Sequence, residues 1–269
     1  MAITRNILVM MMSLFFAGAP AVGHEVTIYN ALPYVLDKLR THQIVLMGTI
    51  HRKPQILDLT ARLLPQLNSA GVTHLALEVS SDQQDNIDRF LRTGMGLGDI
   101  QLHHAIDCPQ YRRLFTIVRM LPPGDRPEVI AVDLPPSRYS GPISRDTYMA
   151  DGLAALLRTQ PEARVMAIVG SLHVLKKLDW LPRVTDRQPS IRSALARRQP
   201  ALKVFSVVNL VNGVNGIPHD FSYLFAEQRG AAAVDLDERF SHWRLGVTDC
   251  LAVRNSLAYE LVDGVILHR

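Results

Sequence analysis

Four short segments of the chain are almost continuously apolar: residues 44–47, 74–79, 129–134 and 165–169. Runs of this length without polar alternation are typical of parallel strands that are covered on both faces. The sequence therefore predicts four buried strands.

Segments with helical spacing of apolar residues lie between these strands. Residues 54–67 form one, and Pro54 stands where the first turn of a helix tolerates proline. Residues 80–94 form another, which Gly94 is expected to close, and residues 111–121 a third. Residues 144–157 follow, with Ser144 as the expected cap. Strands that alternate with helices predict an α/β fold of one domain, an open, mainly parallel sheet with helices on both faces.

The end of the chain is less regular. A basic helix is expected to end at Arg198, and an apolar run covers residues 203–211. We therefore expect a core over residues 44–211 and a C-terminal extension over residues 212–269. Within the extension, residues 221–225 and 259–266 are predicted as strands.

The first 23 residues have the layout of a secretory signal peptide. Arg5 precedes an apolar run over residues 7–16, and small residues lead to cleavage points after Ala21 or Gly23. The alternative is an N-terminal membrane anchor, although the run is short for a bilayer span. No cysteine near the cleavage points offers a lipid anchor. The mature chain, residues 24–269, is thus expected in the periplasm or secreted, with no transmembrane segment.

Charge and cysteine content limit the partners only slightly. Without Arg5 the chain keeps 28 basic and 25 acidic residues, a nearly balanced surface. Basic residues concentrate between Lys176 and Lys203, but aromatic residues are not interleaved with them, and nucleic acid is not an expected partner. Cys108 and Cys250 either form one disulfide or remain separate thiols.

Polar residues follow the predicted strands at their carboxyl ends, where open parallel sheets bind ligands. The first strand leads into Gly48-Thr-Ile-His51 and the fourth into Gly170-Ser-Leu-His173, while Glu78 and Asp133 end the second and third. Each glycine allows a sharp turn, so that the histidine three residues later can point back over the edge of the sheet. We predict a functional site built from His51, Glu78 and His173.

Residues around this trio are expected to support it. Gly48, Gly170, Asp133 and Arg145 are the candidates. Asp133 could equally cap the turn Asp-Leu-Pro-Pro, and Arg145 taken alone predicts a surface ion pair with a neighbouring carboxylate.

Two imidazoles and a carboxylate allow three kinds of chemistry. His51, Glu78 and His173 could be ligands of a divalent metal that activates water. Without a metal, His51 could act as a general base, with His173 as the acid or oxyanion donor. The third option is ligand binding without catalysis, for which haem is one candidate.

Several short motifs in this order resemble one superfamily, which groups ChaN-like haem-binding proteins, erythromycin esterases, TraB proteins and Tiki metalloproteases. The motifs are Leu46-Met-Gly-Thr-Ile-His51, Leu75-Ala-Leu-Glu78, Asp82-Gln-Gln84, Phe90-Leu-Arg-Thr-Gly94, Arg145-Asp146, Met149-Ala150 and Ile168-Val-Gly-Ser-Leu-His173. They are spread over about residues 44–176, half of the chain.

The branches of this superfamily imply different activities. Esterase-like members have Gly-Glu-x-His at the first turn, where this chain has Thr49 in place of the glutamate, a departure that argues against the esterase branch. Tiki and TraB members resemble it in two GxxH motifs and a glutamate, which implies a metal-dependent peptidase. The stretch from Gln83-Gln84 to Gly94 is similar to the ChaN branch, which implies haem binding, with Tyr111, Tyr139 or Tyr148 as the axial ligand.

The sequence therefore favours an exported hydrolase, metal-assisted or dependent on His51 and Glu78, that acts on a peptide or ester bond of a small-molecule or peptide substrate. A haem-binding protein of iron uptake is the alternative. A binding scaffold without catalysis is the second.

Overall fold

The computed structural model describes residues 27–177, 189–211, 230–240, 243, 245, 247–248, 251–252 and 257–269. Within these residues, one sheet of eight strands has the order β1-β7-β10-β6-β2-β5-β3-β4. Its strands are β1 (Tyr29–Asn30), β2 (Ile44–Thr49), β3 (His74–Ser80), β4 (Glu128–Asp133), β5 (Val165–Gly170), β6 (Val204–Val211), β7 (Ala232–Asp235) and β10 (Gly264–His268). In a separate sheet, β8 (Val247–Thr248) pairs antiparallel with β9 (Leu251–Ala252), and each of these strands has two residues.

The sheet is parallel from β10 to β4 and antiparallel only at its other edge. β10 pairs parallel with β6, β6 with β2, β2 with β5, β5 with β3, and β3 with β4. β7 and β1 complete the sheet as antiparallel strands. The carboxyl ends of the parallel strands consequently lie along one edge, where their loops can converge.

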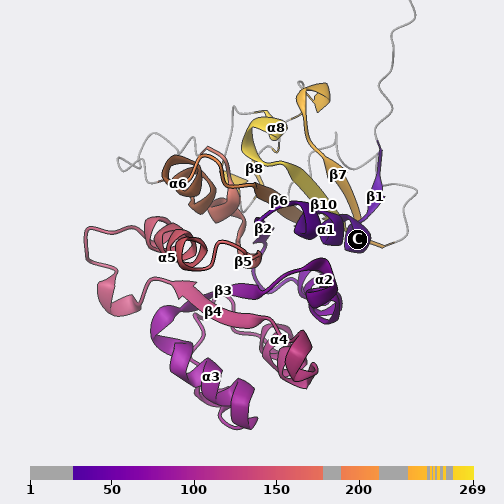
Figure 1. Ribbon diagram of the computed structural model, residues 1–269. Coiled ribbons are helices and arrows are strands. Elements are labelled where there is room, and N and C mark those ends of the chain that lie inside the picture. The colour runs from indigo at the N-terminus through magenta and orange to yellow at the C-terminus, as the bar shows by residue number, and fades with distance from the viewer. Residues whose placement is uncertain are drawn as a thin grey trace, which may run out of the picture.

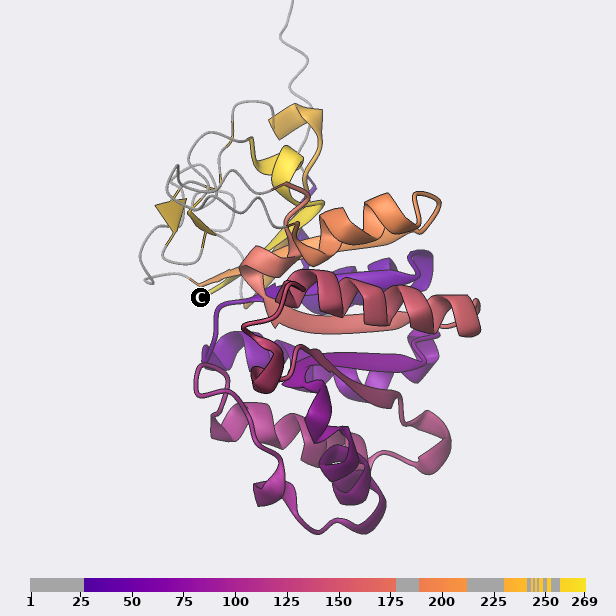
Figure 2. The same cartoon turned by 90° about the vertical axis from the view of Figure 1, so that its left-hand side faces the viewer.

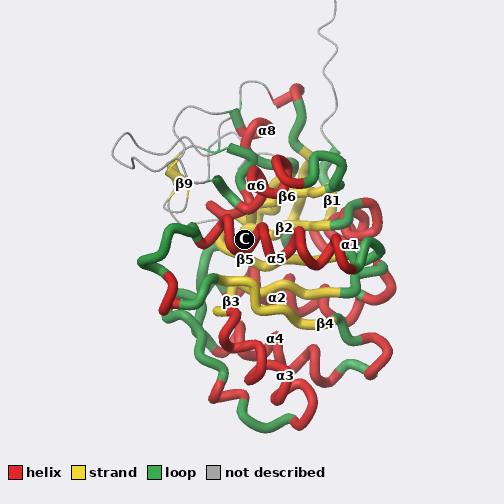
Figure 3. The backbone as a smooth tube through the Cα atoms, turned by 60° about the vertical axis from the view of Figure 1, so that its left-hand side comes forward, coloured by secondary structure: helices red, strands yellow, loops and turns green. Residues whose placement is uncertain are grey.

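Helices cover both faces of the sheet (Figure 1). One face carries α1 (Ala31–Thr41), α2 (Pro54–Leu63), α3 (Gln84–Thr93) and α4 (Pro109–Met120), and the other carries α5 (Arg145–Thr159) and α6 (Ile191–Arg198). Figure 2 shows α5 and α6 in front of the sheet, and Figure 3 shows the strands as a layer behind α5. The short helix α8 (Ala258–Leu261) precedes β10.

Each face of the sheet packs into its own apolar core, which explains the continuous apolar runs. Ile44 and Leu46 face the α5/α6 side, whereas Val45 and Met47 face the α2/α4 side, and all four are buried. Because successive strand residues point to opposite faces, a strand covered on both sides has no polar alternation.

The predicted fold class is confirmed: an open, mainly parallel α/β sheet with helices on both faces. Ser144 caps α5 as expected, its hydroxyl accepting a hydrogen bond from the Thr147 N–H. Gly94 closes α3 with a φ of 81°, a left-handed value that glycine tolerates.

One other sequence prediction was wrong, and three concern residues outside the described ranges. Residues 259–266 do not form one strand, because α8 occupies their start and β10 begins at Gly264. The leader at residues 1–23, the strand at 221–225 and Cys250 lie outside the described residues, so those predictions stand as predictions. None of the helices in the described ranges is long and apolar enough to cross a membrane.

Candidate functional site

The four strands that carry the predicted residues are neighbours in the order β2-β5-β3-β4. Their carboxyl ends bring His51, Glu78, Asp133 and His173 to one stretch of the sheet edge. His51 sits in the turn after β2, where Arg52 adopts a φ of 59° before α2 begins. His173 lies in the 3-10 turn Ser171–Val174 that follows β5.

The imidazoles of His51 and His173 both lie close to Gly170. A Cβ atom at Gly170 would stand 3.1 Å from His51 Cε1, 3.2 Å from His51 Nε2 and 3.4 Å from His173 Cδ2. Both rings thus approach the end of β5 where a side chain is absent. Within the described residues, His51 Nδ1 is buried and has no hydrogen-bond partner.

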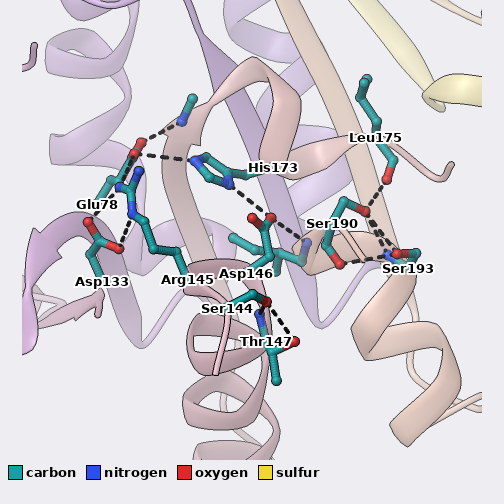
Figure 4. Close-up of polar contacts among 12 residues, drawn as sticks. Glu78, Asp133, Ser144, Arg145, Asp146, Thr147, His173, Leu175, Ser190 and Ser193 are labelled. Carbon is teal, nitrogen blue, oxygen red and sulfur yellow. Dashed lines mark hydrogen bonds and ion pairs between the residues drawn. The ribbon is translucent and has the colours of Figure 1, made fainter. Parts of the chain in front are cut away.

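The Glu78 carboxylate is buried at the centre of a charged network (Figure 4). Its Oε2 accepts a hydrogen bond from the Gly170 N–H at 2.6 Å. Its Oε1 accepts one from Arg145 Nη2 at 2.8 Å and lies 3.4 Å from His173 Nε2. Glu78 therefore fixes the turn after β5 and contacts both cationic neighbours.

Arg145 bridges two carboxylates at the start of α5. Besides Glu78, it donates from Nε to Asp133 Oδ1 at 2.9 Å and from Nη2 to Asp133 Oδ2 at 2.6 Å, a bidentate fork. The expectation of a surface ion pair with an adjacent residue is wrong, because the guanidinium turns inward to buried acids. Asp133 does more than cap its turn, although its Oδ1 also accepts from the Leu134 N–H.

Asp146 completes the network, and sequence reasoning did not select it. Its Oδ1 lies 2.8 Å from His173 Nδ1 and accepts the Ile191 N–H at the start of α6 at 3.0 Å. The available signal was its place next to Arg145 in the first turn of a helix that leads toward the fourth strand. His173 is thus held between the carboxylates of Asp146 and Glu78 (Figure 4).

The two histidines have different charge states at pH 7, because their pKa values are shifted in opposite directions. Burial lowers the pKa of His51, against the opposing charge of Glu78, so this ring is neutral at pH 7. Burial alone would lower the pKa of His173 too, but its hydrogen bonds to Asp146 and Glu78 raise that pKa to about 10. Burial raises the pKa of Glu78, but the hydrogen bond with His173 and the charges of His173, His51 and Arg145 lower it to about 2.

This donor set does not fit a divalent metal, and the proposed ligation by His51, Glu78 and His173 is corrected accordingly. Both nitrogens of the protonated His173 face carboxylates, and the Glu78 oxygens already hold an arginine and a backbone N–H. A metal ligand must present a free lone pair. Among the described residues, no group of three or more His, Cys, Asp or Glu could hold a metal ion.

The pocket that the described residues form beside Asp133 is too small to enclose a haem. This pocket of about 150 Å³, lined in part by Tyr139, is smaller than the roughly 300 Å³ at which pockets begin to enclose drug-sized ligands. Tyr111 is fully buried and the Tyr148 hydroxyl pairs with Ser81 at 2.8 Å. Of the three tyrosines considered, Tyr139 alone is exposed, at 45%.

The remaining candidate, Gly48, has a packing role, and three further histidines lie outside the charged network. A Cβ at Gly48 would meet Val174 Cγ2 at 2.7 Å, so this glycine serves close packing of the turn after β5. His74 is buried in β3, with its Nδ1 2.7 Å from the Thr73 hydroxyl. His103 and His104 are exposed and lie ring to ring, with centroids 4.2 Å apart.

Comparison with solved structures identifies the fold. The ChaN protein of Campylobacter jejuni, with cofacial haem, superposes with a TM-score of 0.55 and 11% identity, over 90% of this chain and 96% of its own. The erythromycin esterase EreC, in an open conformation, gives 0.66 and 9%, over 87% and 92%. A succinoglycan biosynthesis protein gives 0.61 and 12%, over 88% and 90%.

These likenesses confirm a ChaN- and erythromycin-esterase-like fold over nearly the whole chain. At such low identity they concern the fold alone. No family model and no curated protein matches the sequence.

Proposed function

We propose that the chain is a hydrolase of carboxylic esters that works without a metal, with His51 as the general base and His173 as the cationic donor. The observation that carries this proposal is the pair of imidazoles close to Gly170 whose pKa values are shifted in opposite directions. Titratable groups whose environments separate their pKa values in this way are suited to act as base and acid.

His51 has the properties of a base for water. Its ring is neutral at pH 7, and its Nδ1 has no partner among the described residues to occupy a lone pair or proton. Water that loses a proton to this ring becomes the nucleophile. The charge of Glu78 then stabilises the imidazolium that forms, since it raises the pKa of His51.

His173 has the properties of an electrophile toward a carbonyl oxygen. Its Nδ1 side is held at 2.8 Å by Asp146, whereas its Nε2 lies at the longer distance of 3.4 Å from Glu78. A longer contact is easier to exchange for a substrate oxygen, and hydrogen bonds of this kind often tighten only on substrate binding. A fixed cation at the developing oxyanion lowers the barrier to acyl transfer.

An ester is favoured over a peptide by the likeness to an erythromycin esterase, which has the highest of the three TM-scores. Thr49 occupies the motif position where esterase-like sequences carry glutamate, and its hydroxyl donates to the Val169 carbonyl at 3.2 Å. The carboxylate that acts on His51 in this chain is instead Glu78, from β3.

The test is hydrolysis of 4-nitrophenyl acetate by the wild type and by His51→Ala. Loss of a general base costs about 10²- to 10⁴-fold in rate, so kcat of the variant should fall by at least about 10²-fold. His42→Ala, a histidine just before β2 at its far end, is the matched control and should keep the wild-type rate. Equal rates for wild type and His51→Ala would contradict the proposal and favour a binding scaffold.

Haem binding is the second candidate, and exposed Tyr139 is the observation that favours it. This phenol lies beside Arg145, whose guanidinium carbon is 5.9 Å from the ring centroid. A tyrosine oxygen is a known axial ligand of haem iron. Titration with hemin should then give a Soret shift that Tyr139→Phe abolishes, and no shift with the wild type would eliminate this candidate.

Export is part of the proposal. The leader at residues 1–23 would be removed, which leaves His24 at the new N-terminus. Mass spectrometry of the N-terminal peptide from the periplasmic fraction tests it, and an intact Met1 in the cytoplasmic fraction would contradict it.

A further inference from the structure

A small pocket lies beside the charged network, between the ends of β3 and β4 and the loop that precedes α4. It has a volume of about 150 Å³ and is lined by residues that include Ser80, Asp133, His103 and Tyr139. Asp133 belongs to both the pocket and the Arg145 fork.

The walls of this pocket are held in place before any ligand arrives. Gln83, which is buried, accepts hydrogen bonds at its Oε1 from the Gln101 N–H at 2.9 Å and from Asn86 Nδ2 at 3.0 Å. These bonds tie the loop before α4 to the turn after β3. Pre-formed walls reduce the ordering cost of binding.

Ser80 contributes a hydroxyl that lacks a partner. Its Oγ is buried and makes no hydrogen bond with the described residues, although the residue lines the pocket. Buried hydroxyls in folded proteins are nearly always paired, with protein or with water, because an unpaired one costs free energy. A hydroxyl group of a ligand in the pocket would supply the missing partner.

The charges around the pocket repel an anion and offer a cation little attraction. An anion would face the carboxylates of Asp82 and Asp133, both of which line the pocket. A cation would gain little from Asp133, because this carboxylate is already paired with the guanidinium of Arg145. An uncharged ligand avoids the repulsion and can still donate hydrogen bonds to the carboxylate of Asp82.

The apolar part of the lining fits the carbon skeleton of such a ligand. Tyr139, Pro136 and Leu102 present ring and aliphatic surface on the pocket wall. Aromatic side chains combine apolar surface with a polar end, which suits a molecule with C–H and O–H groups. The volume, about half the lower end of ordinary ligand pockets, admits one small group of a larger molecule.

We infer that this pocket binds an uncharged, hydroxyl-bearing group of the substrate, such as a polyol or part of a sugar ring. The binding itself stands apart from catalysis, whereas its description as part of a substrate rests on the proposed esterase function. Ser80 and Asp82 act as hydrogen-bonding partners of the ligand hydroxyls, and Tyr139 covers its carbon face.

The experiment uses glyceryl monoacetate and n-propyl acetate, two esters that differ in two hydroxyl groups. Each is titrated into the full-length His51→Ala variant, which should not turn them over, while amide chemical shifts are followed by NMR. Glyceryl monoacetate should shift resonances of residues 80–83 and 101–103 and bind at least about tenfold more tightly, as expected for one or two added hydrogen bonds.

Ser80→Ala in the same background should weaken glyceryl monoacetate about tenfold and leave n-propyl acetate unchanged. Ser81→Ala is the matched control, because Ser81 pairs with Tyr148 and does not line the pocket. Equal affinities of the two esters, or equal effects of both serine variants, would overturn the inference. Binding of glyceryl monoacetate without hydrolysis by the wild type would support the pocket and contradict the esterase.

Discussion

Arg145 Nη2 donates to Glu78 Oε1 at 2.8 Å across 67 residues of sequence, which joins the start of α5 to the end of β3. The same nitrogen reaches Asp133 Oδ2 at 2.6 Å. One guanidinium therefore compensates two buried carboxylates, and one of these, Glu78, in turn holds the turn after β5 by accepting the Gly170 N–H.

Replacing Arg145 by Met should lower the free energy of unfolding by about 2 kcal/mol. Removing one partner of a buried ion pair costs about 3–5 kcal/mol, and we discount this because the Arg145 side chain is 36% exposed. Urea unfolding measures the change. Arg158→Met, an exposed arginine on the same helix, should stay within about 0.5 kcal/mol of wild type; equal losses for the two variants would refute the prediction.

Gly170→Ala should reduce ester hydrolysis more than it reduces stability. The new Cβ would stand 3.1 Å from His51 Cε1, so the imidazole has to move away from the end of β5. A displaced base lowers kcat, and we expect a loss of about 10²-fold. Gly152→Ala is the control, because nothing lies within 4 Å of its added Cβ and alanine favours its helix. Full activity in Gly170→Ala would count against the role of His51.

Alkaline pH should destabilise the protein through His173. Its pKa is raised to about 10, so its contribution to stability is complete below the unfolded value near 6.5 and is lost as pH rises through 10. Asp146→Asn removes the first of the two carboxylates that hold the proton. The variant should therefore lose less unfolding free energy than wild type between pH 7 and 10, measured with urea; parallel curves would exclude this linkage.

Asn209→Leu should lower the stability of the protein next to the turn that carries His51. The fully buried amide of Asn209 donates to the Gly48 carbonyl at 2.9 Å, and its Oδ1 lies 2.8 Å from His268 Nε2. Leucine leaves those groups unpaired, which costs about 2 kcal/mol. A thermal melt should show the loss, while Asn68→Leu, at an exposed asparagine whose amide donates to Asp125, should change little. A wild-type melting temperature would contradict this.

The sequence alone predicted the parallel core because that core leaves the clearest pattern. β2, β3, β4 and β5 are covered on both faces, and their apolar runs have no polar interruption. The helix α1 was not predicted, although Asn30 caps it and Tyr34, Val35 and Leu39 have helical spacing. Residues 259–266 were taken as one strand, but Glu260 bonds back to the Leu257 N–H and starts a short helix.

The site was predicted in position and not in its connections. Strand ends reveal where His51, Glu78 and His173 lie, since parallel strands share one edge. The contacts that Arg145 and Asp146 make depend on how α5 packs against β4 and α6, which no local pattern contains. Arg145 and Asp146 did not belong to the predicted trio. Their contacts with Glu78 and His173 make the arrangement unsuitable for a metal, and their charges help to shift the pKa values of His51 and His173 in opposite directions.

The central claim is that His51 is neutral and His173 is protonated at pH 7. The most direct measurement is an NMR titration of both imidazoles in the wild-type protein, assigned with His51→Ala and His173→Gln. We predict that His51 titrates below 6.5 and His173 near 10. Two histidines that titrate together near 6.5, or a His51 that is protonated at pH 7, would contradict the account.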